Sequence, residues 1–301
     1  FDILKDIPMY SKWSKIEPLL KGWSDDKKFY IEDGIGERFL LRICDFSKYD
    51  TKRLEYDYMN KISILEIPMS RPVDFGICSN GQNVYSLLTW VNGEDAEVAL
   101  SKYSKERQYQ LGIKSGKILK KIHTISAPEY QEEWAQRYKR KIHLKIQDYQ
   151  NSSIKLENDA IFIKFLEENI SCLNDRPQTI QHGDYHVGNL VISQEGEIGV
   201  IDFNRLDFGD PWEEFNKCIF SWKISIPFAV GQIHGYFDND VPDKFFKLMA
   251  LYIAINTIAS IPWAVPFGEA EVEYMINNAK EVFEWYDGFK THIPVWYKDY
   301  V

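Results

Sequence analysis

Cysteine is scarce in this chain of 301 residues. The four cysteines, Cys44, Cys78, Cys172 and Cys218, lie far apart and form no CxxC pair. Such spacing is not typical of a zinc site or of a disulfide scaffold. Isolated thiols are typical of a reducing compartment, and the sequence therefore predicts a cytoplasmic protein.

An excess of positive charge is also missing, because the 36 lysines and arginines are outnumbered by 45 acidic residues. The net charge of −9 argues against a nucleic-acid partner, whose phosphate backbone an acidic surface repels. The same charge is compatible with a cationic small molecule. We therefore expect a monomer that binds a small-molecule substrate and no nucleic acid, and a cationic substrate is left open.

Long hydrophobic runs are absent apart from one. Residues 248–267, "LMALYIAINTIASIPWAVPF", contain no charged residue and are long enough to span a membrane. Polar residues such as Asn256 interrupt the run, and Pro262 and Pro266 lie at its end. The sequence therefore predicts a buried helix followed by a Pro-rich loop, and no membrane association.

The order of predicted elements divides the chain into two lobes. The first ninety residues predict strands at 28–33, 38–44 and 83–91 and a helix at 49–62. Further on, the sequence predicts helices and one hairpin, with the following positions: helices at 102–123, 130–150 and 157–173, the hairpin strands "NLVI" and "IGVID", and a mainly helical remainder over 212–290. This order predicts an α+β fold with a small β-rich N-lobe, 1–91, ending in a hinge, and a larger, mostly helical C-lobe, 92–301.

The polar residues of one segment suggest chemistry. "QHGDYHVGNL" covers residues 181–190, and "GVIDF" follows at 199–203. The hairpin can bring Asn189 and Asp202 side by side, with Asp184 on the preceding loop. Amide and carboxylate oxygens suit Mg²⁺, and a further carboxylate can accept the proton of a hydroxyl group. A metal clamp and a base are the minimal equipment for phosphoryl transfer.

Two histidines in the same segment allow another interpretation. His182 and His186 are four positions apart, as in a helical pair of metal ligands. Gly183 and Gly188 argue against a helix here, and no HExxH pattern or third soft ligand is present. We therefore expect the two imidazoles to support the loop that carries Asp184.

The pattern "HGDYHVGNL…GVIDF…GDP" resembles the aminoglycoside phosphotransferase family of small-molecule kinases, which also includes choline, homoserine, fructosamine and macrolide kinases. It parallels the catalytic loop and the metal-binding DFG segment of protein kinases, with Gly in place of Arg and Asn in place of the last Gly. The resemblance implies a bilobal protein-kinase-like fold, a phosphotransferase acting on a hydroxyl group, and ATP or GTP as phosphate donor. By it, Asp184 is the catalytic base, and Asn189 and Asp202 bind Mg²⁺.

The resemblance also implies nucleotide-binding residues in the N-lobe. "KGWSDDKKFYI", 21–31, lies where such kinases have the loop over the phosphates, and Ser24 would contact phosphate oxygens. Arg42 occupies the position of the family's phosphate-binding Lys, and Glu55 is its expected partner. An exposed ion pair is the alternative for these two residues. Backbone groups around Thr89 and Val91 would bind the purine edge.

The acceptor is left open by the sequence. A cluster of acidic residues after position 206 suits a polycationic aminoglycoside, but such residues also form ordinary solvated faces. We expect an aminoglycoside-type acceptor. A metabolic kinase acting on an amino sugar, fructosamine, homoserine or choline is the first alternative, and a nucleotide-binding pseudokinase is the second.

Overall fold

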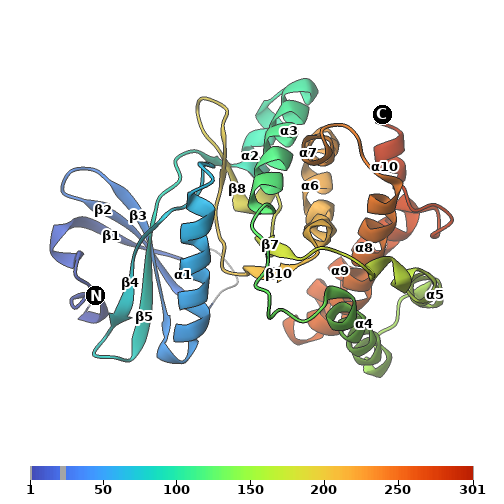
Figure 1. The fold of residues 1–301 in the computed structure, drawn as a ribbon, viewed down its shortest axis with the longest axis horizontal. Helices are drawn as coiled ribbons and strands as arrows, with labels where there is room; N and C mark the ends of the chain where they lie inside the picture. The colour runs from blue at the N-terminus through green and yellow to red at the C-terminus, as the bar shows by residue number, and fades with distance from the viewer. Residues whose placement is uncertain (1, 21–24, 301) are drawn as a thin grey trace. The chain divides into compact units, whose positions relative to one another are not determined.

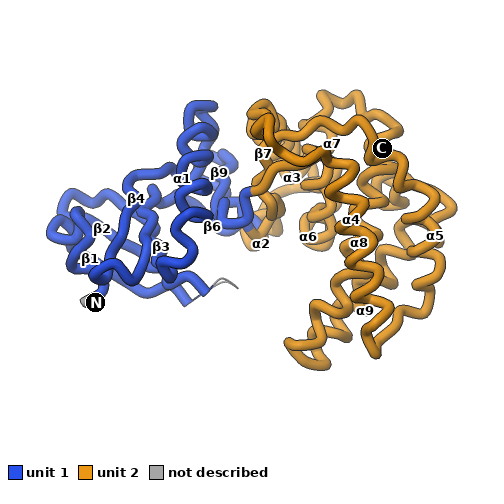
Figure 2. The backbone as a smooth tube through the Cα atoms, turned by 60° about the horizontal axis from the view of Figure 1, so that its bottom comes forward, with its two compact units in different colours: residues 1–96, 189–206 blue, residues 97–188, 207–301 orange. Residues whose placement is uncertain are grey.

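The computed structural model describes residues 2–20 and 25–300. The chain forms two compact units (Figure 2), one of Phe1–Ala96 with Asn189–Leu206 and the other of Glu97–Gly188 with Asp207–Val301. We refer to them as unit 1 and unit 2.

Unit 1 is built on a five-stranded antiparallel sheet with the order β1-β2-β3-β5-β4 (Figure 1). The strands are β1 (Trp13–Leu19), β2 (Lys27–Asp33), β3 (Arg38–Asp45), β4 (Pro72–Cys78) and β5 (Asn83–Thr89). The predicted strands at 28–33 and 38–44 correspond to β2 and β3, and the predicted strand at 83–91 corresponds to β5. Short 3-10 helices flank them, η1 (Asp2–Leu4), η2 (Tyr10–Lys12) and η3 (Phe46–Lys48).

The two faces of this sheet differ in chemistry because side chains alternate along a strand. On one face, Phe29, Ile31 and Leu41 belong to a hydrophobic core that also includes Leu4 and Ile7. The opposite face is partly covered by α1 (Tyr49–Ser63), which packs against β4 and β5. The register pairs Lys28 with Arg42 and Arg42 with Ser86, and these three polar residues form a row on the second face.

The predicted hairpin after residue 188 consists of β8 (Leu190–Ile192) and β9 (Ile198–Val200), which form a small sheet with β6 (Glu94–Asp95). It groups with unit 1, although it follows the first helices of unit 2 in the sequence. Val200 explains this grouping, because it bridges to Met69 and its carbonyl accepts a hydrogen bond from the Ser70 N–H at 3.0 Å. The division of the chain at residue 91 stays a prediction.

Unit 2 is mainly helical. Its elements, with α2 at the boundary, are α2 (Ala96–Ala99), η4 (Leu100–Lys102), α3 (Lys105–Ile122), α4 (Trp134–Asn151), α5 (Asp159–Asn169), η5 (Ile170–Leu173), β7 (Thr179–Gln181), η7 (Pro211–Lys217), α6 (Cys218–Ile224), α7 (Ile226–Phe237), α8 (Asp243–Ala264), η8 (Val265–Phe267), α9 (Glu269–Trp285) and α10 (Val295–Lys298). Strand β10 (Asp207–Gly209) pairs with β7, and η6 (Val187–Asn189) lies at the boundary with unit 1. The predicted helices at 102–123, 130–150 and 157–173 correspond to α3, α4 and α5.

Helices α3 and α7 pack unusually closely because each carries two glycines four residues apart, Gly112 and Gly116 on α3 and Gly231 and Gly235 on α7. A Cβ atom at Gly116 would lie 2.1 Å from the carbonyl oxygen of Gln232, and the other three positions are similarly crowded by the facing backbone. Without side chains the two backbones approach directly. This contact fixes α3, which anchors the loop described below.

Helix α8 accounts for the long hydrophobic run. Among the described residues, the segment Asp243–Phe267 alone is long and apolar enough to cross a membrane, but 67% of its most apolar window is buried within the protein. The prediction of a buried helix is therefore confirmed. Pro262 lies inside the helix, which continues to Ala264 before the 3-10 turn η8.

Candidate active site

The loop that carries Asp184 follows β7 in unit 2 and is held by a buried carboxylate. The backbone N–H groups of His182 and Gly183 donate hydrogen bonds to Oε2 and Oε1 of Glu214, at 2.6 and 2.8 Å. Glu214 lies on η7 and is 2% exposed. A carboxylate that accepts two backbone donors fixes the direction in which the chain leaves the strand.

The ionisation of Glu214 is maintained by its surroundings. Burial raises the pKa of this carboxyl, but the hydrogen bond and charge of His123, the charge of His182 and the His182 N–H outweigh burial, so that the pKa lies below its ordinary value. His123 lies 3.5 Å from Glu214 through Nε2 and contacts the Tyr236 hydroxyl at 2.9 Å through Nδ1. Glu214 therefore stays charged at neutral pH.

The histidines lie where they can support the loop. The Asp184 N–H donates to His182 Nδ1 at 3.3 Å, and the Gly188 N–H donates to His186 Nδ1 at 3.1 Å. His186 Nε2 is 3.6 Å from Asp184 Oδ1. Between them, the Tyr185 hydroxyl donates to the backbone oxygen of Ser115 on α3, at 2.9 Å. The loop is thus tied to the α3–α7 pair.

Asp184 has a cationic neighbour that the sequence did not indicate. Lys217 Nζ, at the end of η7, lies 3.1 Å from Asp184 Oδ1. Asp210 caps the N-terminus of η7, because its Oδ1 accepts the Trp212 N–H at 3.0 Å. Residues three apart lie on one side of a 3-10 helix, so Glu214 and Lys217 both face the loop.

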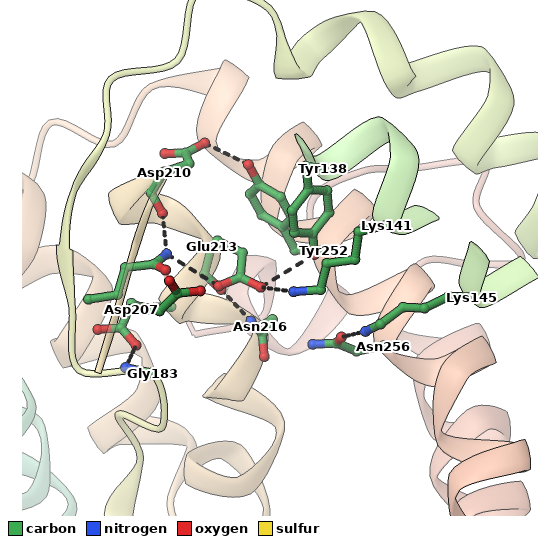
Figure 3. A network of polar contacts seen from close by, with 12 residues as sticks. Tyr138, Lys141, Lys145, Gly183, Asp207, Asp210, Glu213, Asn216, Tyr252 and Asn256 are labelled. Carbon is green, nitrogen blue, oxygen red and sulfur yellow. Dashed lines mark hydrogen bonds and ion pairs between the residues drawn. The ribbon is translucent and has the colours of Figure 1, made fainter. Parts of the chain in front are cut away.

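Several acidic residues that could have formed an acceptor surface are instead hydrogen-bonded to other residues of unit 2. Asp210 is fully buried and accepts two hydrogen bonds from Arg176, at 2.7 and 2.8 Å, and one from the Tyr252 hydroxyl at 2.7 Å. Glu214 holds the loop, and Glu213 accepts from the Tyr138 hydroxyl at 3.3 Å (Figure 3). At Asp210 and Glu214 neither of the two alternatives, an acceptor surface or a solvated face, is formed, because both carboxylates are buried and bonded.

The other predicted site residues with charged side chains lie in unit 1, where side chains of alternating charge, buried except for that of Asp202, form a chain. Asp202 Oδ1 accepts from Arg42 Nη1 at 2.5 Å, and Arg42 donates to Asp26 Oδ2 through Nε and Nη2, at 3.1 and 2.8 Å. Lys52 lies 3.1 Å from Asp26 and donates to Glu55 Oε2 at 3.0 Å. The alternative of an exposed Arg42–Glu55 pair is wrong, because both side chains are buried.

The pKa values in this chain of charges follow from burial and charge together. Burial raises the pKa of Asp26, but the charges of Lys52 and Arg42 lower it by more than burial raises it, so the net shift is downward. Burial lowers the pKa of Arg42, but the charges of Asp202 and Asp26 raise it to a net upward shift. Burial dominates for Glu55, whose pKa is raised. Arg42 is therefore a permanent cation that holds Asp202 and Asp26.

Asp26 and Lys52 were missed by sequence reasoning, although Asp26 lies within the predicted phosphate loop and Lys52 is three residues before Glu55. Lys28 was also missed. It lies directly opposite Arg42 on β2, and its pKa is lowered by burial, which the charge of Asp202 only partly offsets. Ser24 lies outside the described residues.

Asn189 and Asp202 flank the β8–β9 hairpin as predicted. The Ile201 N–H donates to the Asn189 carbonyl at 3.1 Å, which places Asp202 one residue beyond the paired position. Asp202 has a positive φ of 65°, a conformation rare for residues other than Gly and frequent at functional sites. The described residues contain no group of three His, Cys, Asp or Glu residues placed to hold a metal ion. A carboxylate and an amide oxygen do fit Mg²⁺ that shares phosphate oxygens and water.

Thr89 and Val91 differ in the hydrogen bonding of their backbone groups. The Thr89 N–H donates to the Arg71 carbonyl at 2.8 Å, and the Thr89 carbonyl accepts from Ser70 Oγ at 2.8 Å. Val91 makes no backbone hydrogen bond to any residue within 2–20 and 25–300. Of these two residues, only Val91 therefore has backbone groups without a hydrogen-bond partner in the described parts of the chain, and the contact of either residue with a purine stays a prediction.

Comparison with known proteins identifies relatives. Residues 15–245 match the family described as "Phosphotransferase enzyme family". The fold is similar to the GDP complex of wild-type aminoglycoside 2′-phosphotransferase-IIIa, with a TM-score of 0.66 and 13% identity over 93% of this chain and 96% of that chain. It is also similar to the streptomycin–ATP complex of APH(2″)-IIa, with a TM-score of 0.65 and 16% identity over 92% and 98%. A third similar structure is amicoumacin kinase with AMP-PNP, Ca²⁺ and Ami, with a TM-score of 0.63 and 13% identity over 92% and 90%.

A search of curated proteins finds no match. The structural similarities, at such low identity, concern the fold, and they confirm the predicted protein-kinase-like fold. The family match covers well over half of the residues. The chain therefore belongs to the phosphotransferase enzyme family.

Proposed function

We propose that this chain transfers the γ-phosphate of ATP or GTP to a hydroxyl group of a small molecule, with Asp184 as the base. The observation that carries the proposal is the construction around Asp184. Its loop is fixed by the Glu214 carboxylate and the His182 ring, while the Asp184 carboxylate itself is only partly buried beside Lys217. A positioned carboxylate that remains accessible can orient a hydroxyl and take its proton.

Residues of unit 1 have complementary roles in this proposal. Asn189 and Asp202 supply oxygen ligands for Mg²⁺, which, when bound, offsets charge on the phosphates. Arg42 binds Asp202 at 2.5 Å and Asp26 through two hydrogen bonds. Glu55 is connected to this pair through Lys52, which contacts both Glu55 and Asp26. Val91 offers its backbone to the purine.

The first acceptor class that we propose is an aminoglycoside-type compound. It is supported by the solved relatives, since one of them is a complex with streptomycin and ATP and another is a complex with ADP and hygromycin B. The second class is the substrate of a metabolic kinase. A specific observation favours this second class: Lys217 lies beside Asp184, at 3.1 Å, and a cation there suits a neutral or anionic acceptor better than a polycation.

The proposal is tested by Mg²⁺-dependent release of nucleoside diphosphate from ATP and GTP. The acceptor panel contains aminoglycosides, macrolides, amino sugars, amino alcohols and hydroxy acids, and Asp184→Asn is the control. We expect one class to stimulate release strongly and the control to lose that stimulation. Nucleotide binding without turnover on any acceptor would contradict the kinase and favour a pseudokinase.

A further inference from the structure

Three lysines of unit 2, Lys141, Lys145 and Lys217, lie close enough together for the charges of Lys141 and Lys217 to lower the pKa of Lys145. Lys141 and Lys145 are four residues apart on α4 and therefore share one face of the helix. Figure 3 shows both side chains pointing from α4 toward the region of Glu213 and Asn256. Lys217, which pairs with Asp184, is close enough for its charge to affect the pKa of Lys145.

Lys145 is not neutralised by the protein. Its Nζ donates to Asn256 Oδ1 at 3.1 Å, and it forms no ion pair with any residue in the described part of the chain. Its side chain is half-buried, and burial together with the charge of Lys141 lowers its pKa to about 8, with Glu213 offsetting this only in part. An ammonium group withdrawn from water without a counterion is costly.

The local charges leave a positive excess. Lys217 is matched by Asp184 at 3.1 Å, and Lys141 is matched loosely by Glu213 at 3.8 Å. Lys145 has no carboxylate partner among the described residues, although the chain as a whole has a net charge of −9. Glu213 is itself shared, because it also accepts a hydrogen bond from the Tyr138 hydroxyl. An anion that entered here would find an unmatched ammonium with unused N–H donors.

We propose that Lys145, with Lys141 and Lys217, forms a subsite for an anionic group of the acceptor. The acceptor then carries a carboxylate or phosphate group in addition to the hydroxyl that Asp184 activates. This inference rests on the proposed function, which it narrows to the second acceptor class. A polycation would be repelled by the unmatched ammonium group of Lys145, whereas an anionic group would be attracted to it and would keep it protonated.

Matched pairs of acceptors test the sign of the charge directly. One pair is 4-hydroxybutyrate and 4-aminobutan-1-ol, which place a carboxylate or an ammonium group at the same distance from a hydroxyl. A second arm compares sugar phosphates with the corresponding amino sugars, so that the two arms separate carboxylate from phosphate recognition. We expect the anionic member of at least one pair to have the higher kcat/KM. A consistent preference for the cationic members would overturn the proposal.

Substitution of the unmatched lysine tests its role. We expect Lys145→Met to raise the KM for the anionic acceptor by about tenfold or more, the usual loss for a hydrogen bond to a charged group, with the KM for the nucleotide unchanged. Lys139→Met is the matched control, because Lys139 is also on α4 but donates to Asn174 at 2.7 Å. Equal KM values for wild type and Lys145→Met would refute the subsite.

A binding measurement separates this inference from the kinase activity. Calorimetric titration of the anionic compounds into the Asp184→Asn protein needs no turnover. If the double variant with Asp184→Asn and Lys145→Met bound the anionic compounds more weakly than the single variant Asp184→Asn, the subsite would be supported even if the chain transferred no phosphate. Binding of no anionic compound, or binding that is indifferent to Lys145, would overturn the inference while leaving the proposed base at Asp184 in place.

Discussion

At the scale of single residues, Glu214 acts as a positioning residue for the candidate base, because it accepts the N–H groups of His182 and Gly183. In Glu214→Gln, the side-chain amide turns an N–H toward one of these donors, and the loop shifts. We expect kcat to fall by about a hundredfold, a typical result of misplacing a reacting group by 1 Å. The KM for the nucleotide should change little, as steady-state kinetics would show. An unchanged kcat would mean that the loop holds its shape without this carboxylate.

Lys28 is a candidate for contact with the nucleotide phosphates, because Arg42, opposite to it on β3, is bonded to Asp26 and Asp202. We expect Lys28→Met to raise the KM for ATP or GTP by about tenfold, through loss of a hydrogen bond to a charged group. Lys27→Met, at the neighbouring exposed position, serves as the control. The same KM in both variants would assign the phosphate contact elsewhere.

The sequence indicated the candidate residues Asp184, Asn189 and Asp202 because the spacing of one short segment carries that information. Lys217 and Lys145 could not be predicted in the same way. The pairing of Lys217 with Asp184 and the partial burial of Lys145 depend on how η7 and α4 pack within unit 2, and exposed and half-buried lysines look alike in a sequence.

At the scale of elements, the α3–α7 contact depends on the absence of side chains. A Cβ atom at Gly116 would lie 2.1 Å from the Gln232 carbonyl oxygen, which belongs to the backbone and cannot rotate away. We expect Gly116→Ala to lower the free energy of unfolding by about 1–3 kcal/mol, as overpacking typically does. Urea unfolding measures the effect.

The matched control for this substitution is Gly34→Ala, where a Cβ atom would meet only the Lys12 carbonyl oxygen, at 3.9 Å. This variant should unfold at the same urea concentration as the wild type. Equal stability of the Gly116 and Gly34 variants would contradict a close approach of the two helix backbones.

Most elements of secondary structure were predictable because hydrophobic periodicity is local. Phe29 and Ile31 alternate with polar residues and mark β2, and the uncharged run at 248–267 marks most of α8. The grouping of the β8–β9 hairpin with unit 1 was not predictable. It depends on contacts of Val200 with Met69 and Ser70, more than a hundred residues away in the sequence.

At the scale of the whole molecule, Lys145 links stability to pH. Its pKa is about 8 in the folded chain and 10.5 ordinarily, so between these values the folded chain binds fewer protons than the unfolded chain. The free energy of unfolding therefore rises with pH across this range, relative to Lys145→Met. Between pH 7 and pH 9.5 we expect the wild type to gain about 1–2 kcal/mol over the variant in urea unfolding. Parallel pH profiles for the two proteins would show that Lys145 titrates normally.

We propose that Asp184 takes part in phosphoryl transfer and not in nucleotide binding. The most direct measurement compares, in the wild type and in Asp184→Asn, the affinity for nucleotide with Mg²⁺ and the transfer of labelled γ-phosphate to the best acceptor. We predict equal affinities and a loss of transfer by several orders of magnitude in the variant. A variant that still transfers phosphate, or that loses nucleotide affinity and transfer to the same extent, would contradict the claim.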